Sequence, residues 1–254
     1  MRNSYKNIEN RREHILDVLN KNKSMTIEEL SKHLNVSEMT IRRDCNSLAK
    51  MGRITQHLGT VSFVSPDNAS NSDSRYRIKR SLGMEAAKNI SDHDIVFINS
   101  STTAFYAVQA LLNKKVSIIT NNGNVAKLLS DHNIASIILS GGNVNNRDIM
   151  SGDVANRTFL SMRSDWGIIG CAGLSLEQGI STPWIEEANV NRNIIKNSRR
   201  LIVVADYSKF GSFSNFTIGK ISDIDILITD TFVSGKTLDA FRKQGVEVVQ
   251  VTQI

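Results

Sequence analysis

Hydrophobic residues follow two different spacings along this chain. Near the start, Ile8, Ile15, Val18 and Leu19 recur at helical spacing, which predicts a helix over residues 7–20. Further on, the apolar positions form seven short continuous runs, at residues 95–99, 116–120, 135–140, 166–170, 201–205, 225–229 and 246–251. This change of spacing predicts a mainly helical beginning, followed by a larger region in which strands buried on both faces alternate with helices.

Two more helices are predicted close behind the first. Thr26 and Glu29 have the spacing of a capping box, which predicts a short helix that begins at Thr26 and ends near Leu34. After a two-residue connection, Ser37 is the predicted N-cap of a third helix that stops at Gly52. A short helix, a tight turn and a second helix are the elements of a helix-turn-helix.

The third predicted helix has an apolar side and a basic side. At about 100° per residue, Ile41, Cys45 and Leu48 fall in one sector and are expected to pack on the preceding helix. The opposite side carries side chains long enough to reach guanine edges or phosphates, namely Met39, Arg42, Arg43 and Asn46. The alternative is a solvated charged face, but the tight turn and the basic N-terminal region favour a helix that enters a DNA major groove.

A wing is predicted after this helix. In the segment RITQHLGTVSFV, β-prone residues flank Gly59, which indicates a two-stranded hairpin with Arg53 and Gln56 as its polar contacts. The complete predicted DNA-binding set is Thr26, Ser37, Glu38, Met39, Thr40, Arg42, Arg43, Asn46, Arg53 and Gln56.

Composition sharpens the division into two parts. The segment SPDNASNSDS is polar and turn-rich, which predicts a winged helix-turn-helix domain over 1–64, a linker over 65–75 and an α/β domain over 76–254. The net charge is +6, and residues 1–64 hold 11 Lys or Arg against 7 Asp or Glu. The remaining residues hold 20 against 18, so the excess of basic residues is concentrated in the part predicted to bind DNA.

Polar loops follow three of the predicted parallel strands, at the edge of the sheet where ligands gather. Residues 100–103 read SSTT at a predicted helix start, which is suited to phosphate or serves simply as a helix cap. Asn121 and Asn122 precede Gly123 after the second run, and Gly141 and Gly142 follow the third, where glycine lets the backbone approach a ligand. Together these loops predict a site for a small polar anion, with Lys209 as its counter-charge.

Other classes of protein are not favoured by the sequence. Cys45 and Cys171 are the only cysteines and lie far apart, which suits a reducing cytoplasm, and no metal-ligand or cofactor-binding spacing is present. No apolar run approaches the ~20 residues of a membrane span. No hydrolase, P-loop or dinucleotide-binding motif occurs, so a structural role for Asp206 and Lys209 is favoured over an acid/base pair.

The motifs resemble one known family. The stretch NVSEMTIRRD with the segment GRITQHLG is similar to the winged helix-turn-helix of the DeoR family of bacterial regulators of sugar metabolism. The segments FINSSTT, TNNGNVA, LSGG, SGDVA, GCAGLSLEQGIST, EEANV and ADYSKFG resemble, in order, the sensor domain of the same family. The resemblance implies a mostly parallel α/β domain similar to sugar-phosphate isomerases, which binds a phosphorylated sugar without converting it.

The resemblance also implies an effector pocket. Its predicted residues are Lys79, Asn99, Ser100, Ser101, Thr102, Thr103, Asn121, Asn122, Gly141, Gly142, Glu187 and Lys209. Three positions of the segments that resemble the sensor domain depart from the family pattern: Asn99 stands where Asp is usual, Ser101 where Gly is usual, and Asn191 where Lys commonly follows the EA motif. In the wing, Gln56 replaces an arginine, and Cys45 replaces a leucine of the third helix. The loss of one acid at position 99 and one base at position 191 is expected to alter which effector binds or to weaken its binding, and the change at Gln56 puts one wing contact with DNA in doubt.

The predicted function is a non-enzymatic repressor of a carbohydrate operon. Its expected partners are double-stranded operator DNA, a phosphorylated sugar that releases the DNA, and further copies of the chain in a homodimer or homotetramer. One alternative is an isomerase-like or hydrolytic sugar-phosphate enzyme that is tethered to DNA. The other is an architectural or RNA-binding module, which the recognition-helix face disfavours because the major groove of duplex RNA is too narrow to be read this way.

Overall fold

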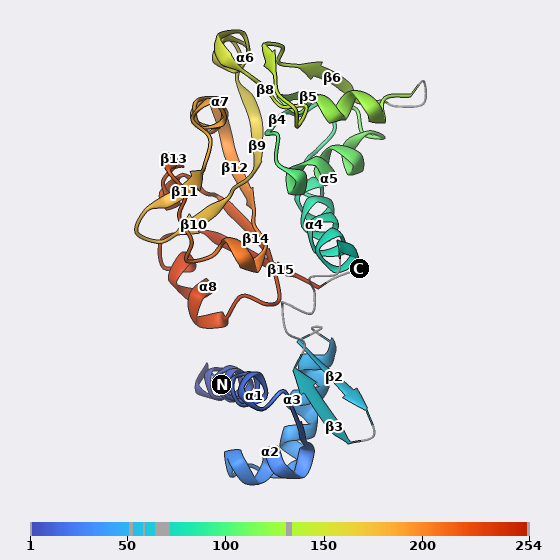
Figure 1. Ribbon diagram of the computed structural model, residues 1–254, viewed down its shortest axis with the longest axis vertical. Helices are drawn as coiled ribbons and strands as arrows, with labels where there is room; N and C mark the ends of the chain where they lie inside the picture. The colour runs from blue at the N-terminus through green and yellow to red at the C-terminus, as the bar shows by residue number, and fades with distance from the viewer. Residues whose placement is uncertain (1, 51–52, 58, 64–71, 131–133, 253–254) are drawn as a thin grey trace. The chain divides into compact units, whose positions relative to one another are not determined.

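The computed structural model describes residues 2–50, 53–57, 59–63, 72–130 and 134–252 (Figure 1). The chain divides into two compact units, residues 1–76 and 77–252. Gly52, the predicted helix stop, and residues 65–71 of the predicted linker lie outside the described residues. The rest of the predicted linker differs from expectation, because helix α4 (Ser72–Ala87) begins within it. Residues 72–74 are serine and aspartate, which are common both in loops and at helix starts, so composition alone does not separate a linker from the first turn of a helix.

The first unit is a three-helix domain with a small antiparallel sheet. Its strand order is β1-β3-β2, so Ser24–Thr26 adds a third strand to the predicted two-stranded wing. A strand of three residues is too short to show alternation in the sequence, which explains why it was not predicted. The elements are α1 (Arg2–Asn22), β1 (Ser24–Thr26), α2 (Ile27–Leu34), α3 (Glu38–Lys50), β2 (Ile54–His57) and β3 (Thr60–Phe63).

Hydrogen bonds and backbone geometry define both ends of α2 and so the turn that leads into α3. The predicted capping box is confirmed: the Glu29 N–H donates to the Thr26 hydroxyl at 3.1 Å, and the Thr26 N–H donates to the Glu29 carboxylate at 2.7 Å. At the other end Asn35 adopts a left-handed conformation with φ 52°, which asparagine tolerates better than most residues. The Val36 N–H then donates to the Ser31 carbonyl at 3.1 Å, so the helix ends sharply.

A small apolar core holds these helices together. Ile15 and Leu19 of α1, Leu30 of α2 and Ile41 and Cys45 of α3 are all fully buried in one cluster. The helical spacing read from the sequence therefore assigned the inward side of α1 and α3 correctly. Because one side of α3 is packed into this cluster, the helix is held rigidly and its opposite side is presented to solvent.

The second unit contains a seven-stranded parallel sheet, and all seven predicted apolar runs are strands in it. The strand order is β15-β14-β12-β9-β4-β5-β6. Along the chain, strands are added outward from β4 in one direction and then outward from β9 in the other, so the order reverses between these two strands. The strands are β4 (Ile95–Ile98), β5 (Ser117–Thr120), β6 (Ser136–Leu139), β9 (Ser164–Gly170), β12 (Ser198–Val204), β14 (Ile226–Asp230) and β15 (Glu247–Val251).

Helices cover both faces of this sheet, as Figure 1 shows. Alternate side chains of β4 point to opposite sides: Val96 and Ile98 join the cluster beneath α4 and α5, whereas Phe97 joins the cluster beneath α6, α7 and α8. The two clusters explain why the strands are continuously apolar rather than alternating. The helices are α5 (Thr102–Leu111), α6 (Gly152–Leu160), α7 (Ile185–Asn197) and α8 (Gly235–Arg242), with 3-10 helices η2 (Gly123–Leu128), η3 (Tyr207–Lys209) and η4 (Ile221–Asp223).

Two small antiparallel additions lie outside the main sheet. One is the hairpin of β7 (Asn143–Val144) and β8 (Met150–Ser151), and the other is a three-stranded sheet of β10 (Gly173–Ser175), β11 (Gly179–Thr182) and β13 (Phe216–Gly219). These strands have only two to four residues each, so the sequence did not predict them. They matter because the β7–β8 turn and the segment after β11 carry side chains to the edge of the sheet where β4 and β9 end.

Candidate functional site

The outward side of α3 has the composition predicted for a DNA-reading surface. Met39 is 67% exposed, and Arg42, Arg43 and Asn46 are also exposed. Arg43 lies against Met39, with its guanidinium nitrogen 3.9 Å from the sulfur atom. The two arginine side chains therefore extend from a helix whose opposite side is locked into the core.

A shallow hollow joins this surface to the wing. Arg42 and Asn46 of α3 line it together with Gln56 of β2, and the cavity has a volume of about 310 Å³. Gly59 at the wing turn also lines it, with φ +81°, a conformation that glycine adopts without strain. The fold thus brings three of the predicted DNA contacts to one concave surface.

The other predicted DNA contacts lie in different settings. Thr26 is exposed but its hydroxyl is engaged in the capping box, and the Ser37 hydroxyl lies 2.9 Å from that of Thr40. Glu38 is exposed at the start of α3, and Arg53 is half-buried. Among these residues, Ser37, Glu38 and Thr40 lie at the N-terminal end of α3, and in helix-turn-helix proteins it is this end of the second helix that contacts bases.

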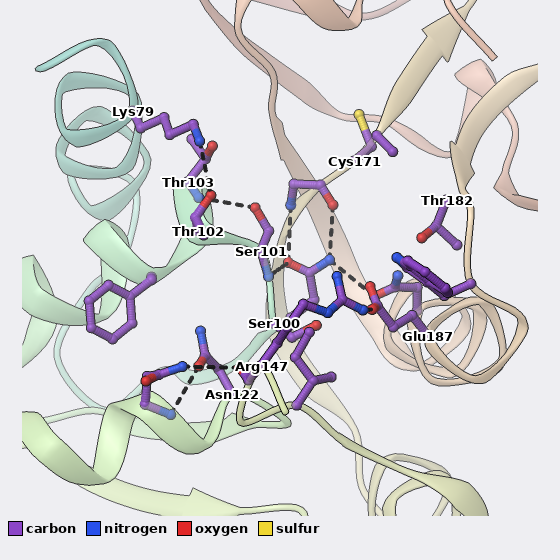
Figure 2. A pocket seen from close by; sticks show the side chains of 18 of the residues that line it. Lys79, Ser100, Ser101, Thr102, Thr103, Asn122, Arg147, Cys171, Thr182 and Glu187 are labelled. Atoms are coloured by element: carbon purple, nitrogen blue, oxygen red, sulfur yellow. Dashed lines mark hydrogen bonds and ion pairs between the residues drawn. The ribbon is translucent and has the colours of Figure 1, made fainter. Parts of the chain in front are cut away.

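A second and larger cavity lies at the carboxyl ends of β4 and β9, where the strand order reverses. Its volume is about 630 Å³, and its walls come from α4, the start of α5, η2, the β7–β8 turn, the start of α7 and η3 (Figure 2). Such a switch point is where open α/β sheets bind ligands. Of the twelve residues predicted for the pocket, nine line it: Lys79, Asn99, Ser100, Ser101, Thr102, Thr103, Asn122, Glu187 and Lys209.

Three predicted pocket residues do not line the cavity. Asn121 is fully buried, and its amide nitrogen donates to the Met150 carbonyl at 3.1 Å. Gly141 and Gly142 follow the edge strand β6 and serve packing instead. A Cβ on Gly142 would lie 2.3 Å from the Ser151 carbonyl oxygen, so this glycine allows β8 and α6 to approach. In this structure the close backbone approach at Gly142 is therefore to β8 and α6, and neither glycine lines the cavity.

The segment after β4 forms the start of α5. Ser101 is the N-cap of this helix, and its hydroxyl accepts the N–H groups of Thr103 and Ala104 at 3.1 and 3.4 Å. Lys79 reaches from α4 to the Thr102 hydroxyl at 3.2 Å, as drawn in Figure 2. Ser101 thus acts as a helix cap, while the hydroxyl of the adjacent Thr102 holds the Lys79 ammonium at the cavity wall.

Asn99 connects three elements at the floor of the cavity. It is buried, and its amide nitrogen donates to the Gly170 carbonyl at 2.9 Å and to Asn191 Oδ1 at 3.0 Å. Its amide oxygen accepts the N–H groups of Gly170 and Ser101 at 3.1 and 3.2 Å. An aspartate at position 99 would place a negative charge against the Gly170 carbonyl, so the asparagine matches its surroundings in this chain.

Arg147 was not predicted, although it spans one side of the cavity. It lies in the β7–β8 turn and forms a salt bridge with Glu187 of α7; both residues are labelled in Figure 2. It also stacks over the Trp184 ring, with its guanidinium carbon 4.9 Å from the ring centre. Burial raises the pKa of Glu187, and the neighbouring Arg147 opposes that increase. The turn is held in place from η2, because the Gly123 N–H donates to the Asp148 carbonyl at 2.7 Å.

Sequence comparisons match both units of the chain. The signature described as "DeoR C terminal sensor domain" matches residues 74–231, and the one described as "DeoR-like helix-turn-helix domain" matches residues 11–67. The chain belongs to the DeoR family. Family membership confirms the predicted fold class and the prediction of a DNA-binding transcriptional regulator.

Similar proteins include named members of the DeoR family. The glycerol-3-phosphate regulon repressor of Escherichia coli K12 is 34% identical over 226 residues, which cover 85% of this chain and 88% of that protein. The repressor GlcR of Bacillus subtilis is 31% identical over 245 residues, or 94% and 95% of the two chains. Among solved structures, ribose 5-phosphate isomerase A of Methanocaldococcus jannaschii aligns over 55% of each chain, with a TM-score of 0.39 and 15% identity.

The lining of the DeoR sensor cavity is strongly cationic. In the part of the chain that the structure describes, the charged residues that line it are Lys79, Lys127, Arg147 and Lys209, against Glu187 alone. Lys127 is paired with Asp148 at 2.7 Å, and Arg147 is paired with Glu187. Lys209 has no hydrogen bond or salt bridge from its side chain to any described residue. An unpaired ammonium in a cationic cavity is suited to an anionic ligand.

Metal and membrane sites find no support in the described ranges. Within them, no three His, Cys, Asp or Glu side chains lie close enough together to hold a metal ion. Within the same ranges, no helix is both long enough and apolar enough to cross a membrane. Asp206 accepts the Ser208 N–H at 2.9 Å as the cap of η3, which favours the structural role that the sequence suggested.

Both cysteines of this DeoR-family chain are predicted to resist alkylation in the native state. Burial raises the pKa of the Cys171 thiol, at the cavity wall, to about 12, and that of Cys45, in the core of the first unit, to about 11. At pH 8 a thiol with an ordinary pKa is partly ionised. The thiolate fraction of these two cysteines is lower than that by a factor on the order of 100 or more, because their pKa values are raised. Iodoacetamide labelling followed by mass spectrometry is expected to modify neither residue natively and both in guanidinium. Native labelling at the denatured rate would contradict this prediction.

Proposed function

We propose that this DeoR-family chain represses a carbohydrate operon and is released from its operator by a phosphorylated sugar. The observation that carries the effector half of the proposal is the cavity lining, with four cations and one carboxylate among the described residues. The DNA half rests on the exposed arginines of α3 beside the hollow shared with the wing. The names of the related repressors support the same assignment.

The phosphate is assigned to the wall formed by the start of α5 and Lys209. Ser100 and Thr102 supply hydroxyl groups there, Lys79 supplies one cation, and the unpaired Lys209 supplies another. Charge-assisted hydrogen bonds of this kind are roughly twice as strong as those between neutral groups. Release then follows from a shift in populations, because the effector favours a form of the protein that does not fit the operator.

A homo-oligomer is part of the proposal. One recognition helix reads only a few base pairs, and helix-turn-helix proteins reach operator specificity by placing two such helices on half-sites about one helical turn apart. An effector that alters the spacing of these helices would lower operator affinity without touching the DNA. Sedimentation of the protein with and without operator DNA tests this part directly.

The chemistry of the cavity supports a sensor rather than an enzyme. Among the described lining residues, the one carboxylate is Glu187, which is paired with Arg147, and the one thiol is Cys171, whose pKa burial raises to about 12. General acid–base catalysis needs a group that titrates near the working pH and can reach the substrate. Incubation of the purified protein with a panel of sugar phosphates is expected to give no turnover at enzymatic rates.

Lys209→Ala is predicted to separate sensing from DNA binding. Loss of a charge-assisted contact worth about 1.5–3 kcal/mol should weaken effector binding roughly tenfold to a hundredfold, while operator affinity without effector stays unchanged. The effector is found first by the rise in thermal stability that it gives the wild-type protein. Operator release is then titrated by gel shift for wild type, Lys209→Ala and Lys243→Ala, which removes an exposed lysine outside the cavity. Equal release of all three proteins would remove Lys209 from the site.

A further inference from the structure

The orientation of the Asn99 amide is fixed by backbone groups. Its oxygen accepts two N–H groups, from Gly170 and Ser101, and its nitrogen donates to the Gly170 carbonyl. A carbonyl can only accept and an N–H can only donate, so the Asn99 amide cannot be turned over without losing three hydrogen bonds. The second hydrogen of the Asn99 nitrogen therefore points to an acceptor on α7, which is Asn191.

This in turn orients Asn191. Since its oxygen accepts from Asn99 at 3.0 Å, its own amide nitrogen must be the atom left over. Asn191 is 3% exposed and lines the cavity, and its amide nitrogen has no hydrogen-bond partner among the described residues. This nitrogen is not one of the fully enclosed polar atoms without a partner, so it opens onto the cavity, where a ligand oxygen can take the place of water as its acceptor.

Glu187 places an acceptor beside this donor. Glu187 and Asn191 are four residues apart on α7, so they lie on one face of the helix, and both line the cavity. A ligand hydroxyl can accept from the neutral amide and donate to the carboxylate, which suits adjacent hydroxyl groups of a sugar or polyol. A ligand carboxylate at the same place would be repelled by the negative charge of Glu187. Arg147 would not offset this repulsion, because its guanidinium is already paired with Glu187.

We propose that Asn191 is a specificity-determining residue, which donates to an uncharged oxygen of the ligand and selects phosphorylated polyols or neutral sugars over phosphorylated sugar acids. The proposal rests on the proposed function and adds the chemical class of the half of the ligand that is not phosphate. A lysine at position 191, by contrast, would offer a charged donor to a ligand carboxylate.

The test compares two probes that differ at one carbon. Sorbitol 6-phosphate carries a terminal hydroxyl where 6-phosphogluconate carries a carboxylate, and inorganic phosphate reports on the phosphate contacts alone. Calorimetric titration of the full-length wild-type protein is expected to show about tenfold tighter binding of sorbitol 6-phosphate than of 6-phosphogluconate. Equal affinity, or tighter binding of the acid, would overturn the proposal without any variant.

Two variants then test the residue itself. Asn191→Leu is expected to weaken sorbitol 6-phosphate about tenfold and to leave inorganic phosphate unchanged. Asn191→Lys is expected to shift the ratio between the probes about tenfold toward 6-phosphogluconate. Asn189→Leu, an exposed asparagine of the same helix that does not line the cavity, is the matched control and should change nothing.

The outcomes separate this proposal from the one on which it rests. Equal weakening of all three probes by Asn191→Leu would mean a merely structural role and overturn the assignment, while the proposed effector class would stand. Absence of binding of every phosphorylated probe to wild type would overturn both. The wild-type ratio needs no substitution, so the proposal stays falsifiable if Asn191→Leu does not fold.

Discussion

Replacing Arg42 and Arg43 together by alanine is expected to lower operator affinity about 30-fold or more. Both side chains are exposed on α3, and Ile41 and Cys45 hold the other side of the helix rigidly in the core. An arginine that reads a base edge contributes ~1–3 kcal/mol to specific binding, and each contact with phosphate adds to affinity for any sequence. Fluorescence anisotropy with operator and with unrelated DNA measures both effects.

Salt dependence assigns the two arginines separately. If Arg42 meets a phosphate, Arg42→Ala should reduce the slope of log affinity against log salt by about one, whereas loss of a base contact mainly reduces the preference for the operator. Arg157→Ala is the matched control, because Arg157 is exposed on α6 and, among the described residues, its salt bridge is with the exposed Asp153. Unchanged operator affinity in the double variant would exclude α3 as the recognition helix.

Asp44→Ala is expected to destabilise the first unit by about 3 kcal/mol. The Asp44 side chain is 4% exposed, and its carboxylate accepts hydrogen bonds from the Arg11 Nε at 2.6 Å and the Arg12 Nε at 3.0 Å, so it ties α3 to α1. Its removal would leave two guanidinium groups facing an apolar gap, although both remain about a quarter exposed to water. Faster hydrogen exchange along α1 and α3 is the direct measure, and operator affinity should fall with it.

An exposed ion pair provides the control for this prediction. Asp153→Ala breaks the salt bridge between Asp153 and Arg157. Both side chains are more than 70% exposed, and exposed salt bridges contribute ~0.2–1 kcal/mol to the free energy of unfolding. Arg11→Ala should fall between the two variants, because Arg12 still pairs with the buried carboxylate. If Asp44→Ala and Asp153→Ala cost the same, Asp44 does not hold the two helices together.

Periodicity and capping predicted much of the fold. The angle of 100° per residue placed Ile41 inward and Arg42 outward, because a helix on a small core has one buried side. The seven continuous apolar runs became the seven parallel strands, because helices cover both faces of that sheet. Thr26 and Glu29 formed the predicted cap because both partners lie within one turn. These signals are local, so no knowledge of distant contacts was needed.

The cavity was predictable only in part. Its floor and one wall follow directly from strand ends, which is why the segment 99–103 and Lys209 were found. Arg147 reaches the cavity from a hairpin turn whose position depends on η2, and no spacing in the sequence encodes that contact. Gly141 and Gly142 do not line the cavity, and the sequence alone could not show this, because tight packing and ligand approach require the same freedom of the backbone.

The order of the parallel sheet has a consequence for the newly synthesised chain. All strand pairs of the first unit lie within residues 24–63, whereas the centre of the larger sheet pairs Val96 with Trp166 and Trp166 with Arg200. Sheets that join distant segments fold slowly, and domains fold in the order in which the ribosome releases them. Each new copy therefore completes its helix-turn-helix unit while β9 is still unmade, so the surface of α3 exists before the cavity between β4 and β9 can form.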